Sequence, residues 1–167
     1  MIDLDSGTAL IFIFMMFYYR RAGIIANIAF IANVFILLAV IALFGATLTL
    51  PGMAGIILTL GMAIDANVII NERIREVLRT GASVQKAIED GYSNAIRAIM
   101  DGNITTFLVA IVLYAYGSGA IKGFAVTISI GILTSMLTSI VGTHGIYQAI
   151  MPKIAKDKNN KKWFGVA

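Results

Sequence analysis

The stretch GMAIDANVIINER, residues 61–73, places Asp65 in the middle of an otherwise apolar run. Leucine, isoleucine and glycine precede the carboxylate, and Val68, Ile69 and Ile70 follow it. A carboxylate is unusual in such surroundings, because moving a charge out of water is costly unless the charge is paired. The rest of the chain decides whether this run belongs to a soluble core or to a membrane.

The composition favours a membrane. Of the 167 residues, 59% are hydrophobic and only 13% are charged, and the mean hydropathy is +0.87. Soluble domains carry about 25% charged residues. One small core cannot bury this much apolar surface, so we expect an all-α membrane protein with the lipid bilayer as its solvent.

The sequence also lacks the residues that several kinds of chemistry require. There is no cysteine, which excludes disulfides and thiolate metal sites, and a single histidine excludes a multi-histidine metal site. No nucleotide-binding, hydrolase or metalloprotease motif is present. We therefore expect no metal, no cofactor and no enzyme activity.

Five apolar segments are predicted to cross the membrane, since a spanning helix needs about 20 mostly apolar residues. They are residues 6–19, 23–46, 52–72, 103–118 and 122–150. The first is short, because acidic residues precede it. We expect it to be the end of a helix that begins in a longer protein, and a tilted or interfacial helix is the alternative.

The basic residues predict the orientation of these spans. Twelve of the 13 fall on one side of a five-span arrangement, and only Lys122 falls on the other. The positive-inside rule makes the twelve-residue side cytoplasmic, which places the C-terminus in the cytoplasm. The pI near 9.5 then reflects orientation signals on short loops, and no nucleic acid partner is expected.

Two further segments lie on the basic side. Apolar residues recur at spacings of three and four over residues 83–100, which predicts a cytoplasmic amphipathic helix between the third and fourth spans. Residues 1–152 then form the transmembrane bundle, and residues 153–167 form a basic cytoplasmic tail. Within it, the polar stretch KDKNNKKW (156–163) shows no periodicity, and we expect it to be disordered, apart from Trp163 and Phe164.

Asp65 is the principal functional candidate, because ionisable residues inside membrane spans mark functional sites by default. No span carries a lysine or arginine near its middle. Loss of hydration disfavours the charged form of a carboxyl group, so an unpaired aspartate in hydrocarbon takes up a proton and releases it when water or a cation arrives. Gly61, one turn earlier, leaves room for such an approach. The alternative is a protonated Asp65 that only donates a hydrogen bond, for example to Asn33.

Other polar residues in the spans allow a structural interpretation beside a functional one. Asn67 and Asn71 lie one turn apart and can bridge helices. Asn103, Thr105 and Thr106 open the fourth span, where we interpret them as a polar start of the helix.

A stripe of small residues runs along the fifth span. Thr127, Gly131, Ser135, Ser139 and Thr143 recur every four residues. Such a stripe allows helix backbones to approach closely, so it is predicted to be a packing face first, and a sliding face second.

Three stretches together resemble the membrane part of the SecD family, the accessory subunit of the bacterial Sec protein-export system. They are FGATLTLPGMAGIILTLGMAIDANVIINERIREVLRTG (44–81), DGNITTFLVAIVLYAYGSGAIKGFAV (101–126) and SIGILTSMLTSIVGTH (129–144). The resemblance is weakest over residues 1–20 and 150–167. It implies that the chain corresponds to family helices two to six, without the first helix and the periplasmic domain.

The resemblance also implies a function. SecD belongs to the RND (resistance-nodulation-division) superfamily, lies in the inner membrane and pairs with SecF. The pair associates with the SecYEG channel and uses the proton motive force to assist the export of precursor proteins. By motif, Asp65 matches the aspartate on the family's proton path, and SecF supplies further residues of that path.

The resemblance implies only weakly that four polar residues support the proton path or bridge helices: Asn67, Asn71, Thr105 and Thr106. One alternative is a half-unit of an RND-type exporter of small molecules or lipids. Another is a structural scaffold in which Asp65 is locked in a hydrogen bond. Because the periplasmic domain and the partner are absent, we expect this chain alone to be inactive.

Overall fold

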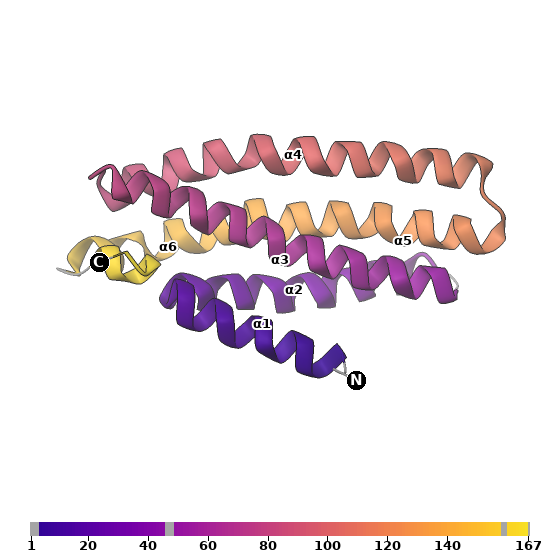
Figure 1. Cartoon of the computed structure of the whole chain (residues 1–167), viewed down its shortest axis with the longest axis horizontal. Helices are drawn as coiled ribbons and strands as arrows, with labels where there is room; N and C mark the ends of the chain where they lie inside the picture. The colour runs from indigo at the N-terminus through magenta and orange to yellow at the C-terminus, as the bar shows by residue number, and fades with distance from the viewer. Residues whose placement is uncertain (1–3, 46–48, 158–159, 167) are drawn as a thin grey trace.

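The computed structural model describes residues 4–45, 49–157 and 160–166, and these ranges contain helices and no strand (Figure 1). The expected all-α architecture is therefore confirmed. The helices are α1 (Leu4–Tyr19), α2 (Arg21–Leu43), α3 (Leu50–Arg79), α4 (Val84–Tyr116), α5 (Gly119–Met136), the π-helical η1 (Leu137–Gly142), α6 (Thr143–Lys156) and the 3-10 helix η2 (Asn160–Phe164).

Within the described ranges, four helical segments are long and apolar enough to cross a membrane. They are α2, α3, α4 and the continuous run of α5, η1 and α6 from Gly119 to Lys156. The remaining expected span, α1, has 16 residues, which rise about 24 Å. A bilayer's hydrocarbon core is about 30 Å thick, so α1 is a shorter apolar helix than the other four.

The longest helices begin at side-chain caps. The Thr49 hydroxyl accepts a hydrogen bond from the Gly52 backbone N–H at 3.1 Å, and Pro51 follows in the first turn of α3. The Ser83 hydroxyl accepts in the same way from the Lys86 N–H at 3.3 Å and starts α4. Each cap satisfies a backbone donor that has no partner within the helix.

α3 is the central helix of the bundle (Figure 1). It contacts α2, α4 and α5, while α1 packs against α2. A side chain added at Gly55 would collide with Thr127, and one added at Gly131 would collide with the fully buried Thr59. The glycines therefore allow α3 and α5 to pack with their backbones close together.

The amphipathic segment at residues 83–100 does not form a separate helix. α4 runs without a break from Val84 to Tyr116, so this segment and the expected fourth span are two halves of one helix. Gly102 is helical, and no proline interrupts the pattern. Nothing in this part of the sequence forces the helix to end, and therefore it continues into the apolar half.

The expectation of disorder is wrong for Lys156, which ends α6, and for residues 160–162, which belong to the 3-10 helix η2. Phe164 is fully buried and stacks on Tyr147 with 5.6 Å between the ring centroids. The Trp163 indole N–H donates to the Asp157 carboxylate at 2.8 Å, and the Arg21 guanidinium lies 4.4 Å from the Trp163 ring. These contacts hold the tail against the bundle, where η2 contacts α2, α3 and α6.

Candidate functional site

The Asp65 side chain lies in a groove between α3 and α4. The groove has a volume of about 160 Å³. Its α3 wall consists of Met62, Asp65, Ala66 and Ile69, and its α4 wall consists of Ala98, Ile99, Gly102, Asn103 and Thr106. The polar groups of this groove are thus one carboxylate, one amide and one hydroxyl.

The Asp65 carboxylate is exposed and unpaired within this chain. Among the described residues it makes no hydrogen bond and no ion pair. A side chain added at Gly61 or at Gly102 would meet no atom within 4 Å, so the space beside the carboxylate is open on both helices. A group from water or from another chain can therefore reach Asp65.

The threonines of α4 differ in their relation to this groove. Thr106 lines it, and its hydroxyl donates to the Gly102 carbonyl at 3.0 Å. Thr105 is exposed outside it and donates to the Asp101 carbonyl at 2.9 Å. Both lie in the middle of α4, so the interpretation of Thr105 and Thr106 as the polar start of a helix is wrong. Of the two threonines, only Thr106 lines the groove that contains Asp65.

Asn67 and Asn71 lie on the opposite face of α3, inside the bundle. Both are buried. Asn67 donates to the Ala63 carbonyl of its own helix at 3.0 Å, and Asn71 accepts a hydrogen bond from the Tyr147 hydroxyl at 3.0 Å. Two residues advance a helix by about 200°, which accounts for the separation of Asn67 from Asp65.

The alternative hydrogen bond between Asp65 and Asn33 is not formed. Asn33 is fully buried, and neither its amide nitrogen nor its amide oxygen has a partner among the residues that the structure describes. It lies on α2, inside the bundle, whereas Asp65 faces outward. The carboxylate therefore stays available.

A second polar contact inside the bundle joins α4 to α6. The hydroxyls of Tyr92 and Thr143 are hydrogen-bonded, and the Tyr92 and Tyr147 rings meet edge to face at 6.0 Å. We did not predict these tyrosines as polar contacts. The available signal was that a buried tyrosine hydroxyl usually requires a hydrogen-bond partner.

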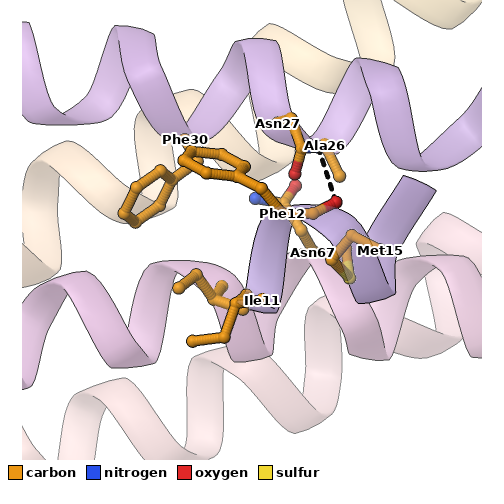
Figure 2. A pocket seen from close by; sticks show the side chains of 8 residues that line it. Ile11, Phe12, Met15, Ala26, Asn27, Phe30 and Asn67 are labelled. Carbon is orange, nitrogen blue, oxygen red and sulfur yellow. Dashed lines mark hydrogen bonds between the residues drawn. The ribbon is translucent and has the colours of Figure 1, made fainter. Parts of the chain in front are cut away.

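A small cavity of about 10 Å³ lies among α1, α2 and α3 (Figure 2). Asn27 and Asn67 both line it, and the Asn27 amide donates to the Phe12 carbonyl at 3.3 Å. The void has about the size of one water molecule. Its lining is mostly apolar, and Asn27 and Asn67 are the two polar side chains that border it.

The small residues of α5 and η1 are buried and use their hydroxyls locally. Thr127 donates to the Phe124 carbonyl at 2.9 Å, and Ser135 donates to the Ile132 carbonyl at 3.1 Å. Ser139 donates to the Ser135 carbonyl. These hydroxyls are bonded to their own helix, so the stripe serves close contact more than bonding between helices.

Further along α3, a buried arginine joins α3 to α1. The Arg75 side chain is 7% exposed, and its Nη1 donates to Glu72 Oε1 at 2.7 Å. The guanidinium lies 4.3 Å from the Tyr18 ring centroid, while its Nε has no partner within the described residues. Glu72 and Arg75 thus form an ion pair between residues three positions apart on α3.

Long apolar helices define this chain as a polytopic α-helical membrane protein. Its ionisable site is the Asp65 carboxylate, in the groove between α3 and α4. Residues 3–153 match the family model described as protein export membrane protein SecD/SecF, C-terminal. The chain belongs to this family.

Individual relatives agree with the family. The chain is 56% identical over 150 residues to protein translocase subunit SecD of Desulfurispirillum indicum, covering 90% of this chain and 29% of that protein. It is 52% identical over 142 residues to the SecD of Escherichia coli K12, covering 84% of this chain and 23% of that protein. The chain thus spans less than a third of the length of these relatives.

Solved structures give the same result. The crystal structure of SecDF from Thermus, described as a translocon-associated membrane protein, superposes with a TM-score of 0.83 at 38% identity. The match covers 88% of this chain and 21% of that one. SecDF in its super-membrane-facing form gives a TM-score of 0.84 at the same identity.

Proposed function

We propose that this chain is the membrane part of a SecD-like subunit that, together with SecF, uses the proton motive force to assist protein translocation through the SecYEG channel. In this role it lies in the bacterial inner membrane with its C-terminus in the cytoplasm. Exported precursor proteins are the substrates, and no enzymatic step is required. The names of the relatives and the family support the protein-export role.

Asp65 is the proposed proton-carrying residue, and its open position carries the proposal. A proton carrier has to alternate between two protonation states, which a carboxyl locked in an internal hydrogen bond cannot readily do. Asp65 has no such lock, and the space beside it is open at Gly61 and Gly102. Asn103 and Thr106 are placed to contact a water molecule that approaches the carboxyl.

The positions of the basic residues support the proposal that a second chain lies at this groove. The nearest basic residue further along α3 is Arg73, eight positions away, which is about 12 Å of helix. Arg73 pairs with Glu76 at 2.7 Å, and Arg75 pairs with Glu72. An ionised Asp65 is costly in hydrocarbon without a cation or water, so we assign the counter-charge to SecF.

The test is proton-gradient-dependent export. The full-length protein and its SecF partner are placed in proteoliposomes that hold a stalled precursor, and Asp65→Asn is compared with Asp101→Asn. Asp101 is an exposed carboxylate on α4 that does not line the groove. We expect Asp65→Asn to abolish the gradient-dependent step while SecF still copurifies, and Asp101→Asn to retain it. Unchanged export by Asp65→Asn would make Asp65 a packing residue.

A further inference from the structure

A second groove lies between α4 and α5, near the connection that joins these two helices. Its volume is about 530 Å³. Two facing alanines, Ala110 and Ala125, are each only 1% exposed and form its floor, while Ile111 and Tyr114 stand exposed at its edge. The lining residues are Phe44, Ala110, Ile111, Tyr114, Ala125, Val126, Ser129 and Ile130. We call this the alanine groove.

The alanine groove is suited to hydrocarbon. Apart from the tyrosine hydroxyl at its edge, its one polar side chain is Ser129, whose hydroxyl donates to the Ala125 carbonyl of its own helix at 2.8 Å. The volume falls within the range of about 300–1,000 Å³ typical of small-molecule sites. α4 and α5 are both apolar spanning segments, so the medium beside this groove is the bilayer.

A single positive charge stands at the mouth of the alanine groove. Lys122 is exposed, and its Nζ lies 5.7 Å from the ring centroid of Tyr114, which lines the groove. Val126, also in the lining, is four positions further along α5 and therefore on the same helix face. Lys122 is the only aspartate, glutamate, lysine or arginine between residues 102 and 152, so no carboxylate on α5 neutralises it.

The shape of the groove argues against a protein helix as its occupant. A helix with its side chains is about 10–12 Å wide, and close helix packing in membranes uses small residues on successive turns. Here Ala110 is followed one turn later by Tyr114. Tyr114 therefore interrupts the row of small residues after one turn. The groove has room for a hydrocarbon chain and not for the backbone of a second helix.

We propose that the alanine groove binds an anionic phospholipid. One hydrocarbon chain lies along the floor made by Ala110 and Ala125, and the phosphate meets Lys122 beside Tyr114. The ammonium donates charge-assisted hydrogen bonds to phosphate oxygens. A zwitterionic headgroup brings its own cation, which competes with Lys122, so the site prefers phosphatidylglycerol to phosphatidylcholine. This inference is independent of the proton-carrying role of Asp65.

Native mass spectrometry of the full-length protein tests this proposal. The probes are phosphatidylglycerol and phosphatidylcholine with identical chains, and the measured quantity is the retained fraction of each. A basic residue near an anionic lipid surface contributes about fivefold to binding. We expect a preference of that size for phosphatidylglycerol in the wild type and no preference in Lys122→Gln. The control Lys153→Gln, an exposed lysine near the other end of the bundle, keeps the preference.

A second variant tests the hydrocarbon part of the site. Val126→Trp fills the alanine groove from its wall, and we expect it to lower the retention of both lipids while the helical content stays the same. If Val126→Trp does not fold, Ser129→Leu provides a smaller filling. Equal losses in Lys122→Gln and Lys153→Gln would overturn the proposal. It would also be overturned if the groove-filling variant kept its lipids but lost a copurifying protein, since the groove would then belong to that protein.

Discussion

Gly91 allows α3 and α4 to cross with their backbones in contact, and replacing it with alanine gives a sharp stability prediction. An added Cβ would lie 2.6 Å from Ile74 Cγ1 and 2.9 Å from both Ile74 Cα and Ile74 N. Ordinary contacts between carbon atoms are about 3.5–4.0 Å. Side-chain rotation cannot move Cα and N away, so the two helices would have to separate by roughly 1 Å.

Two opposing effects determine the magnitude for Gly91→Ala. Alanine is favoured over glycine inside a helix by about 1 kcal/mol. Overpacking a well-packed site costs about 1–3 kcal/mol, and here the upper part of that range applies because backbone atoms collide. We therefore expect Gly91→Ala to lower the free energy of unfolding by about 1–2 kcal/mol.

Gly145→Ala is the matched control, because Gly145 is exposed on α6 and an added Cβ there meets no atom within 4 Å. This variant keeps the propensity gain without the collision, so we expect it to raise stability by up to about 1 kcal/mol. Unfolding by SDS in mixed micelles, followed by circular dichroism, measures both variants. A Gly91→Ala protein as stable as the wild type would refute the proposed backbone contact.

Two further predictions concern the aromatic contacts at the tail. Phe164→Ala should release residues 160–166, because it removes the ring that stacks on Tyr147. We expect faster amide hydrogen exchange in residues 160–166 and unchanged exchange in α3. Unchanged exchange in residues 160–166 would contradict this prediction. Tyr147→Phe should cost about 1–3 kcal/mol, because it leaves the buried Asn71 carbonyl unsatisfied. Tyr114→Phe, at an exposed tyrosine, should cost much less, and equal losses would contradict the argument.

The spans were predictable because hydropathy averages over many residues. α2 and α3 required only long apolar segments flanked by polar ones. The continuity of α4 was not predictable in the same way, since its first half is amphipathic and its second half apolar. The change from amphipathic to apolar composition predicts two separate helices. A helix, however, ends at a capping or helix-breaking residue, and α4 has none between these two parts.

The contacts of Phe164 and Trp163 could not be predicted from local pattern. Phe164 is buried against Tyr147, while the half-buried Trp163 lies against the exposed Arg21, more than 100 residues away in the sequence. Polar neighbours such as Lys161 and Lys162 dominate the composition of the tail. The Phe164 ring holds the tail in place because it buries a large apolar area, and Trp163 adds its contacts with Asp157 and Arg21.

Asp65 could be singled out from sequence because an ionisable residue within an apolar span is rare, and it is costly there unless a cation or water meets it. Its orientation also followed from helix geometry, which turns Asn67 about 200° away from it. The sequence could not show that Ala98 and Gly102 of α4 line the same groove as Asp65. Ala98 lies in the segment predicted as a separate amphipathic helix, and Gly102 lies between that segment and the predicted fourth span.

The two faces of α3 make different contacts. Its outer face presents Asp65 to an open groove, and its inner face bonds Tyr147 through Asn71. Within the described residues no hydrogen bond links the two faces, so a change in the charge of Asp65 cannot reach Tyr147 through a polar chain. Close packing at Gly91 and at Gly131 holds α3 against α4 and α5.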